Sequence, residues 1–179
     1  AWLPAENNQT QTNAGHFMQE LGLQNILQLH QWSAENRFKY WEEVLKTLRV
    51  KFHQAYTDIA QNTQDPENIQ WLPGAAFNIT ESCFQQKPDQ RALVFASEMQ
   101  PKMQVWDYAT LKQKVDQFAS GLRHAGYQPG DRIVLYMPLS AESIVAYLGI
   151  VRAGMTVVSV ADSFSPDELQ RRIDITEAK

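Results

Sequence analysis

The fold is decided by residues 131–170, which read DRIVLYMPLSAESIVAYLGIVRAGMTVVSVADSFSPDELQ. Two short apolar runs, residues 133–137 and 155–160, lie on either side of a segment of helical length. The first run shows no polar alternation, which is typical of a strand buried on both faces of a parallel sheet. The second is rich in β-branched residues, which favour strands. The pattern predicts a βαβ unit with parallel strands.

Residues that begin and end helices stand at the expected turns. Ser140 is a suitable N-cap for the helix between the two strands, and Gly154 follows its basic last turn. Residues 165–168 have the pattern of a capping box with Pro at the first helical position, so they open a further helix. Upstream, Asp107 is the expected cap of a helix that stops at Gly126.

A third apolar run, residues 92–97, predicts another strand before the Asp107 helix. Strand and helix then alternate three times with short connections, which predicts a parallel, doubly wound α/β sheet. A following strand should begin at Glu177-Ala178-Lys179, where the sequence stops. We therefore interpret the chain as a piece of a longer protein, and we expect its open sheet edge to cause self-association.

Residues 1–70 predict a mainly helical amino-terminal extension. Residues 1–15 are rich in Asn, Gln and Thr, so we expect them to be loose or extended on a partner surface. Two short helices are expected on either side of Gly22, and Ser33 is the expected N-cap of the clearest helix. The apolar stripe of that helix is Phe38, Trp41, Leu45, Leu48 and Phe52. We expect this stripe to face a core. We also interpret the aromatic cluster Trp32, Phe38, Tyr40 and Trp41 as core packing rather than as a ligand or base-stacking platform.

Composition excludes several classes of function. The net charge is −4 with no block of five like charges, so nucleic acid is not an expected partner. No uninterrupted apolar run, such as residues 133–137, exceeds five residues, which is far shorter than the ~20 residues that span a bilayer. Cys83 is the single cysteine, which fits a reducing, cytoplasmic compartment. The four histidines have no metal-ligand spacing, so we expect no metal site.

The eight glycines form no nucleotide-binding motif. GxGxxG is absent, and Gly121 and Gly126 have the spacing of a P-loop with Tyr127 where Lys is required. The sequence also lacks a GxSxG elbow, an HExxH helix and a CxxC pair. We therefore assign no catalytic residue in this chain.

A family resemblance is carried by several short motifs and by their spacing. After Asp107 they are Gly126, Gly130-Asp131-Arg132, Tyr136-Met137-Pro138, Glu142, Ala153-Gly154 and Phe164-Ser165-Pro166. With these motifs the chain resembles the amino-terminal region of AMP-forming acyl-CoA synthetases. Residues 71–75 (WLPGA), with Asn78 and Glu81, are similar to the segment that enters the large domain of this family. Residues 1–4 (AWLP) and 33–41 resemble the amino-terminal extension of acetyl- and acetoacetyl-CoA synthetase-like members.

The resemblance implies an AMP-forming ligase. Such enzymes join a carboxylic acid to ATP, giving an acyl-adenylate and pyrophosphate, and CoA then displaces AMP. ATP, CoA and Mg²⁺ are the implied cofactors, used with a Ser/Thr/Gly/Lys-rich phosphate loop and a lysine. No such loop occurs before Lys179. Residues 71–179 are then the first part of the α/β large domain, inactive alone and with no tightly bound cofactor.

One cofactor contact follows from the resemblance. In acetyl-CoA synthetase-like members a glycine-containing loop lies against the adenine end of CoA, and its counterpart here is Ala161, Asp162, Ser163 and Phe164. Asp162 and Ser163 replace two glycines, and a carboxylate repels phosphate unless it is paired. Arg171 and Arg172 can offset that charge or be simply solvated. Two interpretations therefore stay open: a CoA contact, which we favour, and a polar turn before a capped helix.

Two other functions remain open. A non-catalytic binding or scaffold paralogue of the same fold is the main alternative. A luciferase or a peptide-synthetase adenylation domain is the other, and the extension before Trp71 argues against it, because such relatives usually lack one. The extension favours a short carboxylic acid as the substrate.

Overall fold

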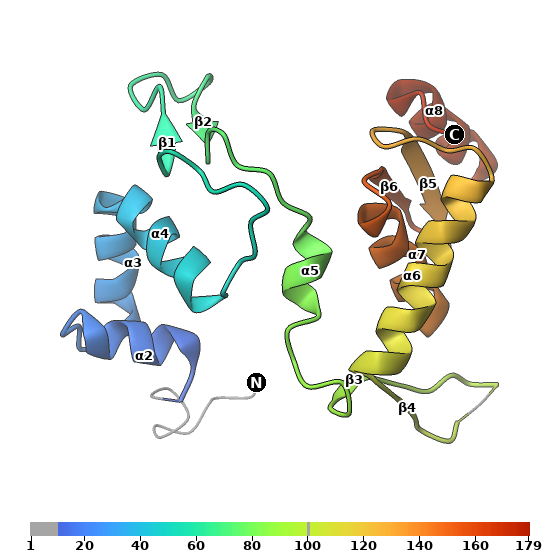
Figure 1. Cartoon of the computed structure of the whole chain (residues 1–179), viewed down its shortest axis with the longest axis horizontal. Helices are drawn as coiled ribbons and strands as arrows, with labels where there is room; N and C mark the ends of the chain where they lie inside the picture. Colours follow the sequence, from blue (N-terminus) through green and yellow to red (C-terminus); the bar gives the residue numbers. More distant parts are fainter. Residues whose placement is uncertain (1–10, 100) are drawn as a thin grey trace. The chain divides into compact units, whose positions relative to one another are not determined.

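The computed structural model describes residues 11–99 and 101–179 (Figure 1). The chain divides into two compact units, one ending at Phe77 and the other spanning Asn78–Lys179. Each unit is described by itself. None of the helices in the described residues is long and apolar enough to cross a membrane.

In its described residues, the first unit consists of three helices followed by a short antiparallel strand pair. The elements are α2 (Asn13–Glu20), α3 (Ile26–Glu35), α4 (Arg37–Thr47), β1 (Ala60–Gln61) and β2 (Gln70–Trp71). The predicted break at Gly22 is confirmed, since Gly22 has φ +68° between α2 and α3. The prediction that residues 1–15 are loose or extended is wrong for residues 13–15, which are helical, with Thr12 as the N-cap of α2. Residues 1–10 of that prediction lie outside the described residues.

The predicted helix start at Ser33 is wrong. Asn25 caps α3 by accepting a hydrogen bond from the Gln28 N–H, and the helix continues through Ser33. Ser33 Oγ instead donates to the carbonyl O of His30 at 2.8 Å, which a serine inside a helix can do. Asn36 then separates α3 from α4.

The apolar stripe on α4 is only partly core. The ring centroid of Trp71 lies 5.7 Å from that of Phe38 and 6.4 Å from that of Trp41. Trp41 is nevertheless 47% exposed. Phe52 lies beyond the end of α4 and packs against Tyr56 and Phe77. The interpretation as buried core is therefore wrong for Trp41 and for Leu48, which is 54% exposed, and Phe52 is not part of the helix.

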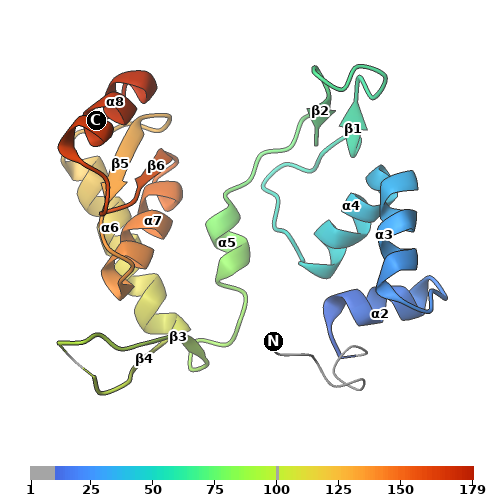
Figure 2. The same ribbon diagram turned by 180° about the vertical axis from the view of Figure 1, so that it is seen from behind.

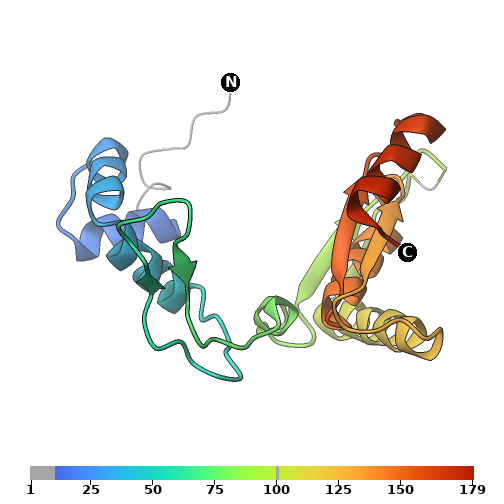
Figure 3. The same ribbon diagram turned by 90° about the horizontal axis from the view of Figure 1, so that it is seen from above.

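The second unit contains the predicted βαβ unit (Figure 2). Its elements are α5 (Ile79–Cys83), β3 (Arg91–Phe95), β4 (Gln104–Asp107), α6 (Tyr108–His124), β5 (Arg132–Tyr136), α7 (Ala141–Arg152), β6 (Thr156–Val160) and α8 (Pro166–Thr176). Strands β5 and β6 pair in parallel, with Ile133 opposite Val157. Helices α6 and α7 lie on one side of these strands and α8 on the other (Figure 3).

The predicted helix boundaries of this unit are confirmed. Asp107 caps α6 through a 2.7 Å hydrogen bond from the Thr110 N–H, and Ser140 caps α7. Ser165 and Glu168 form the expected capping box of α8. These caps span three residues, so the local sequence is enough to specify them.

The strand expected at residues 92–97 exists, but its predicted parallel pairing is wrong. β3 pairs antiparallel with β4, a strand that the sequence analysis missed. β4 is short and ends at Asp107, which is also the N-cap of α6. The pattern of the helix start therefore dominates the sequence there, and no strand was predicted. Parallel pairing of named strands is therefore confirmed only for β5 and β6.

Lys179 lies beside β5 as a third parallel neighbour. Its N–H donates to the carbonyl O of Arg132 at 2.7 Å, and the Val134 N–H donates to its carbonyl O at 3.4 Å. The carbonyl of Asp131 accepts from Thr156 at the start of β6. Backbone groups of successive strand residues point to opposite edges, so Lys179 and β6 flank β5 on opposite sides. Residues 177–179 form no assigned strand, because Glu177 ends α8, but Lys179 makes the two hydrogen bonds to β5 that a parallel strand would make.

Candidate functional site

The strand arrangement points to one edge of the second unit. In open parallel α/β sheets, ligands bind beyond the carboxyl ends of the strands, where the strand order reverses. Because the chain places β6 on one side of β5 and returns to the other side at Lys179, that reversal occurs at β5. The segments that follow β5 and β6 therefore form the candidate site.

A cavity of about 340 Å³ lies at this edge. It is lined by the ends of β5 and β6, by Met137 and Leu139, by the first two turns of α7, and by Ala161 and Asp162. Most of the lining is apolar, with hydroxyls from Ser143, Ser159 and Tyr147. Asp162 is the one charged residue in the lining. The size is sufficient for a small organic group.

The predicted loop, Ala161, Asp162, Ser163 and Phe164, is held to β5 through Tyr136. Tyr136 Oη lies 2.9 Å from the carbonyl O of Asp162 and 2.7 Å from that of Phe164. Within the loop, the Phe164 N–H donates to the carbonyl O of Ala161 at 3.1 Å. The first three residues are exposed and Phe164 is half-buried. Only Ala161 and Asp162 of the four line the cavity.

Arg172 of α8 contacts the same loop. Its guanidinium lies over the Phe164 ring, 4.0 Å from the centroid, and its Nη1 donates to the carbonyl O of Glu168 at 2.9 Å. Arg171 is exposed. The Ser165 N–H donates to Glu168 Oε2 at 3.0 Å. The hydrogen bonds from Ser165 and, less strongly, the charge of Arg172 hold the pKa of the Glu168 carboxyl below its usual range.

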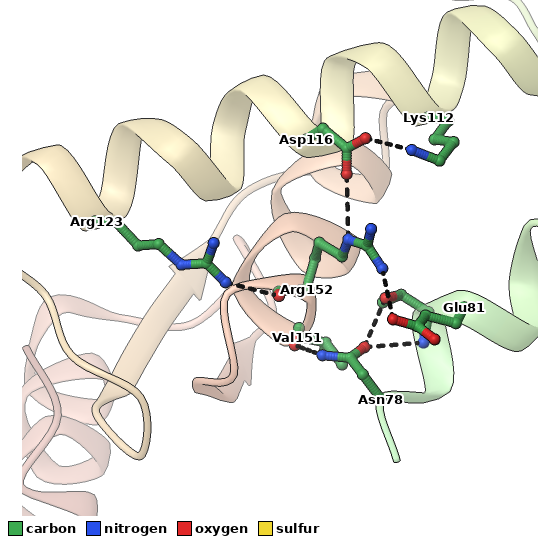
Figure 4. Close-up of polar contacts among 8 residues, drawn as sticks. Asn78, Glu81, Lys112, Asp116, Arg123, Val151 and Arg152 are labelled. Carbon is green, nitrogen blue, oxygen red and sulfur yellow. Dashed lines mark hydrogen bonds and ion pairs between the residues drawn. The ribbon is translucent and has the colours of Figure 1, made fainter. Parts of the chain in front are cut away.

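A second polar cluster surrounds the carboxyl end of α7 (Figure 4). Arg152 pairs with Asp116 of α6 at 3.2 Å and with Glu81 of α5 at 3.3 Å. The Asn78 amide donates to the carbonyl O of Val151 at 2.8 Å, and Arg123 donates to that of Arg152 at 3.3 Å. Side chains from two other segments thus satisfy carbonyls at the helix end.

This cluster holds helices together rather than presenting a reactive group. Its members come from α5, α6, α7 and the residue before α5. Asn78 and Glu81 were indicated only by the family resemblance, and their partners were not predicted. No local signal indicates the pairing of Arg152 with Glu81, because the two residues lie 71 positions apart.

Comparisons with known proteins agree with this architecture. The family model described as AMP-binding enzyme matches residues 80–179. The chain belongs to this family. A second model, described as acetyl-coenzyme A synthetase N-terminus, matches residues 26–83. The resemblance to AMP-forming acyl-CoA synthetases is therefore confirmed, together with the α/β fold preceded by a mainly helical region.

Relatives in this family are considerably longer than the chain. It is 29% identical to probable acyl-activating enzyme 17, peroxisomal, of Arabidopsis thaliana, with 100% of the chain and 28% of the relative covered. It is 28% identical to acetyl-coenzyme A synthetase of Pasteurella multocida, with 88% of the chain and 24% of the relative covered. The solved acetoacetyl-CoA synthetase from Streptomyces lividans matches with TM-score 0.86 and 26% identity over 99% of the chain and 29% of that protein. The chain thus spans about a quarter of these relatives.

Proposed function

We propose that this chain is the amino-terminal part of an AMP-forming acyl-CoA synthetase. The observation that carries the proposal is the presence of two family matches in the expected order, the acetyl-coenzyme A synthetase N-terminus and then the AMP-binding enzyme. We assign residues 1–70 to a helical amino-terminal extension. We assign residues 71–179 to the first part of the α/β large domain, ending before the phosphate loop.

The proposed reaction has two steps. A carboxylate oxygen attacks the α-phosphorus of ATP and pyrophosphate leaves, giving the acyl-adenylate. The CoA thiol then attacks the acyl carbonyl carbon, the thiol proton is lost, and AMP leaves with the electrons of the broken C–O bond. Mg²⁺ would neutralise phosphate charge in the first step. The chain alone is inactive on this proposal, because it supplies the sheet and one wall of a site rather than the reacting groups.

The residues proposed to meet CoA are Ala161, Asp162, Ser163 and Phe164. Their support is the position of the loop at the carboxyl end of β6, beside the cavity, where ligands of parallel α/β sheets bind. Tyr136 supports this role, because it holds the loop backbone in one place. A loop fixed in this way loses little conformational entropy when a ligand binds.

Location is inferred from composition, whereas the small-molecule partners are inferred from the family match. The single Cys83 favours a cytoplasmic protein, although some relatives carry the word peroxisomal in their names. The partners are a small carboxylic acid, ATP and CoA, and the acidic charge disfavours nucleic acid. We also propose that the chain self-associates when separated from its continuation. A clean monomer in light scattering at high concentration would contradict self-association.

The proposal is tested by carboxylate-dependent exchange of pyrophosphate into ATP, measured on the full-length protein. Acetate, propionate, acetoacetate and hexanoate are compared, and exchange with at least one of them is expected, with a short acid favoured. The 179-residue chain alone is the matched control and should show no exchange. A full-length protein that exchanges with none of these acids would instead support the non-catalytic scaffold paralogue.

A further inference from the structure

The outer edge of β6 carries backbone groups without partners. The Thr156 N–H donates to the carbonyl O of Asp131, so Thr156 and every second residue after it direct their backbone groups toward β5. The N–H and C=O groups of Val157 and Ser159 therefore point away from β5. This sheet has two strands, and no other residue of 11–99 or 101–179 pairs with the outer edge of β6. These groups are left for a strand from elsewhere.

The opposite edge of the sheet, on β5, is already in use. The backbone of Lys179 bonds to that of β5. The loop after β6 also turns toward β5, because its carbonyl groups accept hydrogen bonds from Tyr136. Helices α6 and α7 cover one face of the strands and α8 covers the other (Figure 3). The edge of β6 is therefore the side of this sheet that the described residues leave open.

The sequence of β6 lacks the features that protect natural edge strands. Thr156–Val160 reads TVVSV, and no charged residue or proline occurs between Arg152 and Asp162. Natural edges usually carry a lysine, a proline or a bulge that prevents pairing with another chain. A run of β-branched residues without charge instead favours such pairing. The strand is thus suited to meet a further strand at this edge.

The edge is also complementary to itself. When two copies of β6 lie antiparallel about a two-fold axis at Val158, Val157 of one copy stands opposite Ser159 of the other. The outward groups of these two residues then exchange both of their N–H···O bonds, and the axis repeats the pair. Asp162 follows the strand, so the two copies of this carboxylate stand at opposite ends of the pairing and do not face each other.

We propose that the outer edge of β6 is an interface through which two copies of this chain associate as an antiparallel strand pair. The inference rests on the self-association proposed above and is independent of the enzymatic activity. Each copy contributes a strand of 5 residues. Such a contact is smaller than the ~1,200 Å² of a stable interface. The dimer is therefore weak, and its population rises with protein concentration.

Sedimentation velocity of the 179-residue chain tests the interface. The natural chain should shift from monomer toward dimer as its concentration rises from about 5 to about 500 µM. Ser159→Lys places a charge at an exposed position of the edge and should raise the dissociation constant about tenfold, or about 1.4 kcal/mol. Ser163→Lys is the matched control, because Ser163 is also exposed but lies in the loop beyond β6, and it should leave the constant unchanged. Thermal unfolding verifies that each variant is folded.

A disulfide across the two-fold axis gives a second measurement. Cys83 is first replaced by Ser, because it is an exposed free thiol. Val158→Cys then places the thiols of two copies opposite each other at a position without hydrogen bonds, with Cα atoms about 4.5 Å apart. Oxidised glutathione should convert these thiols to an intermolecular disulfide while glutathione itself is reduced. Ser163→Cys in the same background should form little covalent dimer.

The outcomes separate this interface from other forms of association. A chain that stays monomeric at the highest concentration overturns self-association and this inference together. A monomer with slow hydrogen exchange at Val157 and Ser159 would assign the edge to another segment of the same chain, which also overturns the inference. Dimers that persist unchanged in Ser159→Lys, or equal covalent dimer from Val158→Cys and Ser163→Cys, overturn the β6 interface alone. Pyrophosphate exchange by the full-length protein is measured separately, so its absence contradicts the proposed function and not this interface.

Discussion

The two units of this chain bury their apolar residues to very different extents. In the second unit Ile150 is 1% exposed, within a cluster of α6, α7 and the parallel strands. Val115 is 0% exposed, in a second cluster of α6 and α7 with residues of β3 and β4. In the first unit Phe17 and Leu29 are the buried large apolar residues of the described part, while Trp71 stays 43% exposed. Both units are rich in large apolar side chains, so composition does not explain the difference.

The difference follows from what each unit packs against. A parallel strand pair gives α7 a broad apolar surface, and Gly149 lets α7 approach Phe118 of α6 closely. The helices of the first unit meet mainly through edge-to-face and tilted aromatic contacts, such as Phe17 with Trp32 at 5.5 Å. A helical unit with two very short strands lacks that surface, and its stability rests on fewer fully buried groups.

Removing a buried side chain from each unit is expected to give the largest contrast. Ile150→Ala in α7 should lower the free energy of unfolding by about 2–5 kcal/mol, because it leaves a cavity in the core of the second unit. Leu29→Ala in α3 removes a buried side chain of the first unit, which is 7% exposed, and should cost less, near the lower end of that range, because few other buried groups surround it. Urea unfolding measures both. Equal losses would mean that the first unit has a core of similar quality.

Adding a methyl group where α6 and α7 lie closest should have the next largest effect on stability. A Cβ on Gly149 would lie 2.7 Å from Cδ1 and 3.0 Å from Cβ of Phe118. The ring can turn away, but its Cβ cannot, so Gly149→Ala should destabilise by about 1–3 kcal/mol. Gly121→Ala in α6 is the control, since its Cβ would meet nothing within 4 Å. That control should be stabilising by up to about 1 kcal/mol, and the reverse order in thermal unfolding would contradict this account.

Breaking the charged cluster at the end of α7 should have a smaller effect. Arg152→Ala leaves the carboxylates of Asp116 and Glu81 without their shared partner, and all three side chains are partly exposed. We expect a loss of about 1–2 kcal/mol in urea unfolding. Lys46→Ala removes exposed ion pairs with Glu42 and Glu43 in the first unit and should have no measurable effect. If the Arg152 cluster contributed no stability, Arg152→Ala and Lys46→Ala would both leave the free energy of unfolding unchanged.

Lowering the pH should give the smallest difference in stability between the two units. Hydrogen bonds from the side chain and then the backbone of Thr110 hold the pKa of Asp107 below its usual range. The cap is therefore fully stabilising above about pH 4 and loses this contribution as the pH falls through the lowered pKa. The caps of α2 and α3, Thr12 and Asn25, do not titrate in this range.

Hydrogen exchange of the α6 and α3 amides measures this effect. In the natural chain, protection of α6 should fall more than that of α3 when the pH is lowered from 5 to below about 3. Asp107→Asn keeps an acceptor at the cap without a titrating group, so its α6 should lose less protection. Equal losses in the natural chain and the variant would show that the cap charge does not contribute.

The sequence by itself determined the features of this protein that depend on near neighbours. The caps at Asp107, Ser140 and Ser165 were predictable because each bond joins residues three positions apart. The βαβ unit was predictable because two apolar runs flank one amphipathic segment. The misplaced helix start at Ser33 shows the limit of such rules, because a competing cap at Asn25 came earlier in the chain.

Only the tertiary structure decided which distant segments meet. Pairing of β3 with β4 rather than with a parallel neighbour depends on which strand is available, and no single residue of 91–95 encodes it. The Arg152 cluster and the cavity beside Asp162 combine residues from segments far apart in the sequence. Their charges and shapes have consequences only once the core of α6, α7 and the strands has brought those segments together, because hydrogen bonds and ion pairs act over a few ångströms.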